Sequence, residues 1–310
     1  MTTLIFALPG NESLAEGLLD RDGYELGDAT VRRFPDGESY VRINSPVSEQ
    51  GVALLCTLDR PDEKLLPLLF LAKTARELGA ARIGLIAPYL AYLRQDRRFK
   101  EGESVTSRHF ASIVSACFDW LVTIDPHLHR YCCLDQVYSI PSRAVHAAGA
   151  ITDWIQSHIT RPLIVGPDSE SEQWVADVAR QIDADHVVLE KIRHGDREVE
   201  VSVPNVERWS DHTPVILDDI ISTARTMIET VGHIRGSGLA APTCIGVHAI
   251  FAGDSYEELR QAGAGEIVTC NTVPHSSNAI DVTSPIVEAV RDLGHKRSVQ
   301  PGCDSSEREP

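Results

Sequence analysis

Short apolar runs recur along the chain, and most of the segments between them carry apolar residues at helical spacing. The short runs are typical of strands buried on both faces of a parallel sheet, and the helical spacing is typical of amphipathic helices. The runs predict strands at residues 4–8, 52–57, 82–87, 120–124, 162–165, 187–189, 215–217, 243–250 and 266–269. The helical spacing predicts helices at residues 61–78, 104–116, 151–157, 174–182, 227–234 and 284–293.

The order of these elements restarts around residues 140–147, so the chain consists of two successive halves of similar size. Strands that alternate with helices indicate an α/β fold built on parallel sheets. We therefore predict two pseudo-repeated domains, each a mainly parallel sheet flanked by helices, over residues 1–147 and 148–295. Residues 296–310 are rich in Ser, Glu and Pro, which predicts a disordered tail.

Composition narrows the class of partner. A chain of 310 residues with 43% hydrophobic residues is globular and long enough for two domains. Its 29 basic and 45 acidic residues give a formal net charge of −16, which argues against nucleic acid or an anionic membrane as partner. A polyanionic substrate must therefore meet a local basic cluster, a metal ion, or both.

Cysteine usage indicates a reducing compartment. The chain has seven cysteines, an odd number, and none has CxxC spacing, so free buried thiols are expected in place of disulfides or zinc ligands. The N-terminal segment lacks the basic flank and the long apolar run of a signal peptide, and no stretch approaches the length of a membrane span. These features predict a cytoplasmic protein.

Two adjacent carboxylates, Asp218 and Asp219, follow a predicted strand and precede a predicted helix. Open α/β sheets bind ligands at the carboxyl ends of their strands, and backbone N–H groups at a helix start favour phosphate. Because carboxylates repel phosphate, we expect them to face sugar hydroxyls or a metal ion, while Ser222, Thr223 and Thr226 donate to phosphate oxygens. The alternative interpretation is an ordinary capped helix start, with acids near the positive end of the helix dipole.

The most polar segment spans residues 88–103, directly after the predicted strand at 82–87. Tyr and Phe flank a cluster of four cations in this segment of a net-acidic protein: Arg94, Arg97, Arg98 and Lys100. Such a cluster is typical of an anion site with aromatic faces for a base. A solvated surface loop is the alternative.

Two more loops in the first half carry candidate chemistry. The Pro-Asp-Gly turn at 35–37 predicts a hairpin. The alternative interpretation is functional: the exposed tip, with Phe34, contacts a ligand or a neighbouring subunit. After the predicted strand at 120–124 come His127 and His129, which are either metal ligands or structural residues.

In the second half, residues 190–211 are charged and weakly patterned, with a β-like stretch at 201–203. A loop of that length inside a compact domain is often a lid. Residues 166–172 form an acidic loop before the helix at 174–182.

Taken in order, several of these motifs resemble the ribose-phosphate diphosphokinase (phosphoribosyl pyrophosphate synthetase) family. The resembling segments are residues 34–38, 88–89, 94–100, 102–103, Asp125-x-His127, Lys191-x-Arg193 and 218–226. The RQDR segment with its flanks is highly specific, whereas the DD-x-x-x-T-x-x-T loop is shared with type I phosphoribosyltransferases. The resemblance covers roughly residues 3 to 295 and implies two type I phosphoribosyltransferase-like domains, in homodimers that commonly assemble into hexamers.

The resemblance implies a Mg2+-dependent reaction in which O1 of ribose 5-phosphate attacks the β-phosphorus of ATP, giving 5-phosphoribosyl 1-diphosphate and AMP. On the N-terminal, ATP side, the implied ATP-binding residues are Arg94, Gln95 and Asp96, with Phe34, Asp36 and Glu38 reaching the adenine from a neighbouring subunit. On the C-terminal side, Asp218 and Asp219 bind the ribose hydroxyls, and the 5-phosphate is bound by Ser222, Thr223, Ala224, Arg225 and Thr226. The implied catalytic residues are Lys191 and Arg193 on the mobile loop, and the implied magnesium residues are His127 and Asp168.

The chain departs from the family pattern in two places. Glu170 and Ser171 stand where the family usually has two glycines near the ribose, and Arg225 stands where the phosphate loop usually has glycine. If that last position needs a positive φ, an Arg strains it by roughly 1 kcal/mol; otherwise Arg225 adds a cation near the phosphate or points to solvent. The alternative functions are a non-catalytic, synthetase-associated regulatory subunit and a phosphoribosyltransferase.

Overall fold

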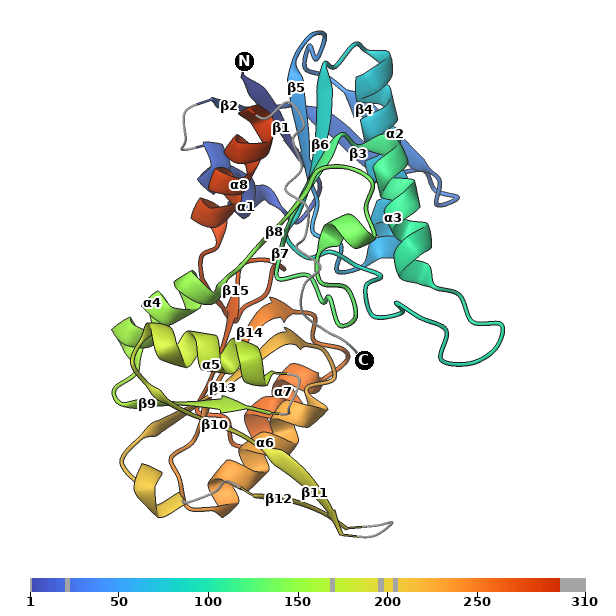
Figure 1. Cartoon of the computed structure of the whole chain (residues 1–310). Helices are drawn as coiled ribbons and strands as arrows, with labels where there is room; N and C mark the ends of the chain where they lie inside the picture. The colour runs from blue at the N-terminus through green and yellow to red at the C-terminus, as the bar shows by residue number, and fades with distance from the viewer. Residues whose placement is uncertain (1, 20–22, 168–170, 195–197, 203–205, 296–310) are drawn as a thin grey trace. The chain divides into compact units, whose positions relative to one another are not determined.

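The computed structural model describes residues 2–19, 23–167, 171–194, 198–202 and 206–295. The chain divides into two compact units (Figure 1). Unit 1 runs from the N-terminus to Val145 and includes the C-terminal segment from Thr283, and unit 2 comprises His146–Val282.

Unit 1 is built on a six-stranded parallel sheet with strand order β2-β1-β5-β6-β7-β8. Its strands are β1 (Thr3–Ala7), β2 (Tyr24–Leu26), β5 (Gly51–Leu55), β6 (Arg82–Ala87), β7 (Trp120–Ile124) and β8 (Ser142–Val145). The central strands are buried almost throughout, as their continuous apolar sequences require in a sheet covered on both faces. The helices that cover it are α1 (Glu12–Leu19), α2 (Pro61–Glu77), α3 (Thr106–Cys117) and α8 (Thr283–His295), with a 3-10 turn, η1 (Leu134–Gln136).

Unit 2 repeats this plan. Its six-stranded parallel sheet has the order β10-β9-β13-β14-β15-β16. The strands are β9 (Pro162–Gly166), β10 (Asp185–Val188), β13 (Thr213–Ile221), β14 (Thr243–Ala249), β15 (Glu266–Cys270) and β16 (Asn278–Ile280). The remaining elements are α4 (Ala148–His158), α5 (Glu172–Gln181), η2 (Val206–Trp209), α6 (Arg225–Gly236) and α7 (Ser255–Gln261).

In each unit an antiparallel hairpin follows the second strand in chain order. In unit 1 it is formed by β3 (Ala29–Arg33) and β4 (Ser39–Ile43), and in unit 2 by β11 (Glu190–His194) and β12 (Glu198–Ser202). In each unit the chain enters the sheet, adds an edge strand, makes the hairpin and then returns to the other side of its first strand. The predicted pair of pseudo-repeated, mainly parallel α/β domains is therefore confirmed.

The last helix belongs to unit 1. Helix α8 packs against β7, β8 and α1, and the Arg82 guanidinium donates to the Leu293 carbonyl over 2.7 Å. Residues 283–295 were expected in the second domain, so that part of the predicted boundary is wrong, while the boundary expected at 147 lies beside Val145. The reason is packing: α8 buries Ile286, Val287 and Val290, and its apolar face completes the unit that begins the chain.

No helix in the described part of the chain is long and apolar enough to span a membrane.

Candidate active-site loops in the two units

Each sheet has a point at which its strand order reverses. It lies between β1 and β5 in unit 1 and between β9 and β13 in unit 2, because chain connections run outward in both directions from there. Ligands of open α/β sheets bind outside the carboxyl ends of the strands at such a point. The side chains found at this position differ between the two units.

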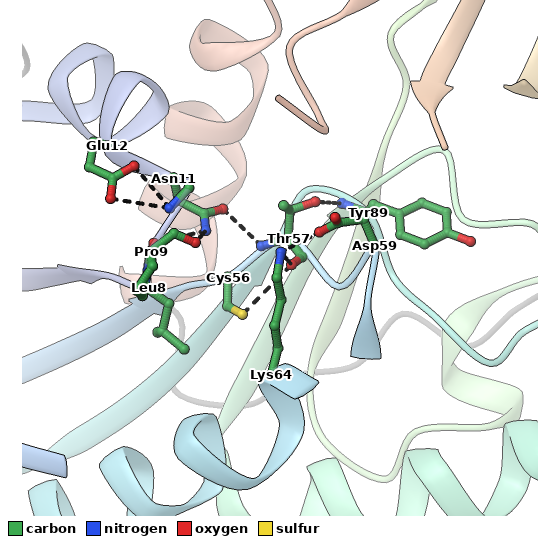
Figure 2. A network of polar contacts seen from close by, with 10 residues as sticks. Leu8, Pro9, Asn11, Glu12, Cys56, Thr57, Asp59, Lys64 and Tyr89 are labelled. Carbon is green, nitrogen blue, oxygen red and sulfur yellow. Dashed lines mark hydrogen bonds and ion pairs between the residues drawn. The ribbon is translucent and has the colours of Figure 1, made fainter. Parts of the chain in front are cut away.

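In unit 1, side chains of the chain itself occupy the reversal point. Figure 2 shows the Asn11 side chain between the end of β1 and the end of β5: its amide donates to the Leu8 carbonyl over 3.0 Å, and its oxygen accepts from the Thr57 N–H over 2.8 Å. Lys64 donates to the Thr57 carbonyl over 3.0 Å and pairs with Asp59. The polar groups at this crevice therefore bond to each other.

In unit 2, the corresponding strand β13 carries the two predicted carboxylates. The strand is longer than its apolar run suggests, and it extends through Asp218 and Asp219 to Ile221. Both aspartates are half-buried, in contrast to the fully buried residues that precede them. Their position at the carboxyl end of a central strand is the one that the sequence predicts for a ligand site.

The loop after β13 contradicts the interpretation as an ordinary capped helix. Helix α6 begins at Arg225, its N-cap is Ala224, and no side chain caps it. The first turn of α6 carries no acidic residue, since Asp218 and Asp219 lie back on the strand. The helices α2, α3, α4, α5 and α7 also lack a side-chain cap, so what distinguishes α6 is its left-handed N-cap residue and its place after the two carboxylates of β13. The N–H groups at such a helix start favour phosphate.

Arg225 is not the strained residue of this loop. The residue with positive φ is Ala224, at 55°, whereas Arg225 is the first residue of α6 and is exposed. Among the alternatives left open for Arg225, the strained backbone is therefore excluded. The Arg225 cation instead lies at the start of a helix, where a positive charge is unfavourable unless an anion is nearby.

The start of the same loop is held by the segment that follows β14. The Ser222 carbonyl accepts from the Ala252 N–H over 3.0 Å and from the Ser255 hydroxyl over 2.7 Å. Ser255 is only 2% exposed, so its hydroxyl is committed to this bond. The sequence offers no local signal for this contact, because it joins residues 33 positions apart.

The charged segment expected as a lid contains a hairpin. Lys191 and Arg193 lie at alternate positions of β11, opposite Val201 and Val199 of β12. The expected magnesium residue Asp168, together with Glu170, lies outside the described residues.

The hairpin predicted around the Pro-Asp-Gly turn is present in unit 1. Gly37 has a φ of 94°, which a side chain would strain, and the Phe34 N–H donates to the Glu38 carbonyl over 2.8 Å. The Glu38 N–H donates to the Asp36 carboxylate over 3.2 Å. Phe34 is 39% exposed, and the Arg32 guanidinium stacks on its ring, so this tip presents an aromatic face and charged groups to its surroundings.

The arginine-rich segment after β6 is neither helix nor strand. Arg94 is exposed and Gln95 is half-buried, whereas Asp96 is buried and its carboxylate accepts from Arg130. Arg98 is exposed and donates to the Glu103 carbonyl over 3.0 Å. Two of the three predicted ATP residues of this segment are therefore accessible, and the third is tied to the neighbouring loop.

The histidines after β7 lie close together. The rings of His127 and His129 stack with centroids 6.2 Å apart. Among the described residues no three His, Cys, Asp or Glu side chains converge on a metal position. Mg2+ usually keeps several waters and binds through one or two protein groups plus substrate phosphates. A protein that binds Mg2+ together with ATP therefore does not need three converging protein ligands.

The buried thiols are unsuited to nucleophilic chemistry. Burial raises the pKa of Cys56 and of Cys244 to about 12, so neither forms thiolate near neutral pH. Cys270 is also buried, and no disulfide joins the described cysteines. A covalent cysteine mechanism therefore has no support at these positions.

Comparison with known proteins identifies the chain. Residues 3–117 match the family described as the N-terminal domain of ribose phosphate pyrophosphokinase, and residues 134–285 match the phosphoribosyl transferase domain. The chain is 31% identical to the ribose-phosphate pyrophosphokinase of Methanopyrus kandleri, over 94% of this chain and 99% of that one. The chain belongs to the ribose-phosphate pyrophosphokinase family. The ribose-phosphate pyrophosphokinase of Methanobrevibacter smithii is 29% identical, over 93% of this chain and 100% of that one.

A solved structure agrees on the fold. The phosphoribosylpyrophosphate synthetase of Mycobacterium smegmatis superposes with a TM-score of 0.83, covers 95% of this chain and 99% of its own, and is 21% identical. The predicted resemblance, the pair of phosphoribosyltransferase-like domains and the assignment to a ribose-phosphate pyrophosphokinase type of enzyme are confirmed by these matches.

Proposed function

We propose that this ribose-phosphate pyrophosphokinase transfers the diphosphoryl group of ATP to O1 of ribose 5-phosphate, giving 5-phosphoribosyl 1-diphosphate and AMP. The observation that carries the proposal is the start of α6 in unit 2. Two half-buried carboxylates at the carboxyl end of β13 are followed by the N-terminus of α6, which suits a ligand with hydroxyls at one end and a phosphate at the other.

Ribose 5-phosphate is assigned to this loop of unit 2. Asp218 and Asp219 accept from the ribose hydroxyls. The 5-phosphate is bound by the backbone and side chains of Ser222, Thr223, Ala224, Arg225 and Thr226. In this arrangement the phosphate offsets the Arg225 charge at the helix start, which gives a role to the residue that departs from the family pattern.

ATP is assigned to unit 1. Arg94 and Gln95 contact the nucleotide from the arginine-rich loop, and Asp96 belongs to the same segment. Phe34, Asp36 and Glu38 on the hairpin tip of a neighbouring subunit reach the adenine, which requires a homo-oligomer. The polar contacts at the reversal point of unit 1 support this choice, because there the Asn11 and Lys64 side chains bond to the chain itself, at the position that corresponds to the proposed ribose 5-phosphate site of unit 2.

Magnesium and the hairpin of unit 2 are assigned to the transferring group. Bound Mg2+ shields the charge of the triphosphate and polarises its phosphoryl oxygens. The protein residues that would hold it are His127 and Asp168. Lys191 and Arg193 stabilise the negative charge that builds on the β-phosphate, and their hairpin excludes water that would otherwise hydrolyse ATP.

We propose that the protein acts in the cytoplasm. The described cysteines form no disulfide, which supports a reducing compartment. A non-catalytic regulatory subunit is disfavoured because Lys191 and Arg193 are both present, and a phosphoribosyltransferase is disfavoured by the matches to the N-terminal domain of ribose phosphate pyrophosphokinase.

The deciding experiment follows AMP formation from ATP and ribose 5-phosphate with Mg2+. We expect AMP and 5-phosphoribosyl 1-diphosphate in equal amounts, with no turnover when either substrate or the metal is omitted. Well-folded protein that binds ATP without forming AMP would overturn the proposed reaction in favour of the regulatory subunit.

A further inference from the structure

The arginine-rich loop of unit 1 is tied to the loop that follows the neighbouring strand. Strands β6 and β7 pair in parallel, so the segments that follow them leave the sheet at the same edge. From the second segment, one guanidinium nitrogen of Arg130 donates to both Asp96 carboxylate oxygens, over 2.8 and 3.0 Å. The Asp96 side chain is 1% exposed and that of Arg130 is 33% exposed, so the pair joins a buried carboxylate to a partly exposed guanidinium.

Further contacts join the same two loops. The Tyr131 hydroxyl donates to the Asp96 carbonyl over 3.3 Å and lies 3.2 Å from the Ser107 hydroxyl. The Arg130 guanidinium lies 5.5 Å from the centre of the Phe99 ring. Arg130 and Tyr131 therefore hold the segment from Asp96 to Phe99 by its backbone, its carboxylate and its aromatic ring.

We propose that Arg130 is a positioning residue for nucleotide binding. Through its ion pair with Asp96, it orients the arginine-rich loop that contacts the nucleotide. The inference rests on the proposed function, in which Arg94 and Gln95 contact ATP and His127 serves the metal. Arg94 and Gln95 directly precede Asp96, and His127 lies three residues before Arg130. The ion pair thus joins the nucleotide residues of one irregular loop to the metal residue of the other.

The physical reason is preorganisation. A loop outside helices and strands must lose conformational entropy when it closes around a ligand, and that loss weakens binding. A buried carboxylate cannot leave its cationic partner without a large desolvation penalty, so the pair restricts both loops before ATP arrives. Neither Asp96 nor Arg130 has to contact ATP for this effect.

The test compares Arg130→Met with the double variant Asp96→Asn/Arg130→Met. In the single variant a buried carboxylate loses its partner, so we expect both lower stability and a KM for ATP raised about tenfold to a hundredfold, with the KM for ribose 5-phosphate unchanged. In the double variant the unpaired charge is gone. We expect its stability to return towards wild type while the KM for ATP stays high, because the link between the loops is still missing.

Two further variants complete the design. Arg130→Lys keeps the charge and shortens the reach, so its KM for ATP should lie between those of wild type and Arg130→Met. Arg76→Met is the matched control, since Arg76 forms a two-bond ion pair with Asp119 away from these loops, at 2.9 Å for both bonds, and it should leave the KM for ATP unchanged.

The outcomes separate the inference from the proposed function. If the KM for ATP recovers together with stability in the double variant, or rises equally in Arg76→Met, the positioning role is wrong. If wild-type protein forms no AMP, the proposed reaction fails. Calorimetric binding of Mg-ATP to the same variants then tests the positioning role by itself, and unchanged affinity in Arg130→Met would reject it.

Discussion

Arg225 is the residue of the proposed phosphate-binding loop that departs from the family pattern, and Ala224 directly precedes it. Ala224 has a left-handed backbone, which costs a residue with a side chain roughly 1 kcal/mol compared with glycine. Its small side chain is nevertheless buried, and Arg225 begins the helix in an ordinary conformation. The departure at Arg225 therefore adds a positive charge to the loop, and Arg225 itself does not have the positive φ that would strain it.

Lys191 carries the expected catalytic charge. We predict that Lys191→Ala lowers turnover about a hundredfold to a thousandfold, by analogy with the loss of one stabilising donor, and leaves ribose 5-phosphate binding intact. Steady-state AMP formation and calorimetric binding of ribose 5-phosphate measure the two effects. The control is Lys73→Ala, which removes an exposed lysine of α2. Equal losses of turnover and binding in Lys191→Ala would contradict its role on the hairpin.

The Ser255 hydroxyl donates to the carbonyl of Ser222, which begins the loop that we propose binds the 5-phosphate. We predict that Ser255→Ala raises the KM for ribose 5-phosphate about fivefold, as expected for the loss of one bond worth about 1 kcal/mol, and leaves the KM for ATP unchanged. Ser237→Ala is the matched control, because the Ser237 hydroxyl donates to the Ile234 carbonyl over the same 2.7 Å at the far end of α6. The role of Ser255 is rejected if both variants behave alike in the assay.

At the scale of elements, the ends of β1 and β5 are joined by Asn11. Its oxygen is the acceptor for the buried Thr57 N–H, so Asn11→Ala leaves that donor unsatisfied. We predict a loss of about 1–3 kcal/mol in the free energy of unfolding, measured by urea denaturation. Asn44→Ala, which removes an exposed asparagine next to β4, should change it by less than about 0.5 kcal/mol. A comparable loss in both variants would show that Asn11 has no special role.

The segment after β15 carries a histidine, His275, whose pKa lies below its ordinary value. Burial lowers the pKa of His275, whose ring contacts Phe251 and Tyr256, and its Nδ1 accepts from the Ser277 N–H over 3.2 Å. A group with a lowered folded-state pKa binds fewer protons in the folded state than in the unfolded state. Its contribution to stability is therefore present above the unfolded pKa of about 6.5 and is lost as the pH falls through the folded pKa.

We therefore predict that wild-type protein loses more stability than His275→Gln when the pH falls from about 7.5 to about 5. Denaturant unfolding of both proteins across this range measures the difference. A parallel loss in the two proteins would show that other groups account for the pH dependence.

At the scale of the molecule, α8 joins the C-terminal part of the chain to the unit that begins it. Ile286 is fully buried, so Ile286→Ala should cost about 2–5 kcal/mol. Hydrogen exchange should then become faster in the strands of unit 1 that pack against α8, namely β7 and β8. Glu288→Ala, an exposed position of the same helix, should leave exchange unchanged. Faster exchange confined to unit 2 would contradict this assignment of the helix.

The two repeated α/β domains could be predicted from the sequence wherever their strands and helices have a clear apolar pattern. Central strands such as β6 and β7 were predicted at their observed bounds, because strands buried on both faces must be continuously apolar. The short edge strands β2, β8 and β16 were not predicted, since three or four residues carry too little pattern. The hairpin β11–β12 was expected as a lid with one β-like stretch, because its charged residues obscure the alternation.

The sequence alone determined the alternation of strands and helices and the presence of polar residues in the loops at the strand ends. These features depend on residues that are near each other in the chain, so periodicity and motif spacing reveal them. Only the tertiary structure decided that α8 completes unit 1, that Asn11 joins β1 to β5, and that Asp96 is bonded to Arg130. These contacts join residues dozens of positions apart or more, and they form only when the sheets bring the loops together.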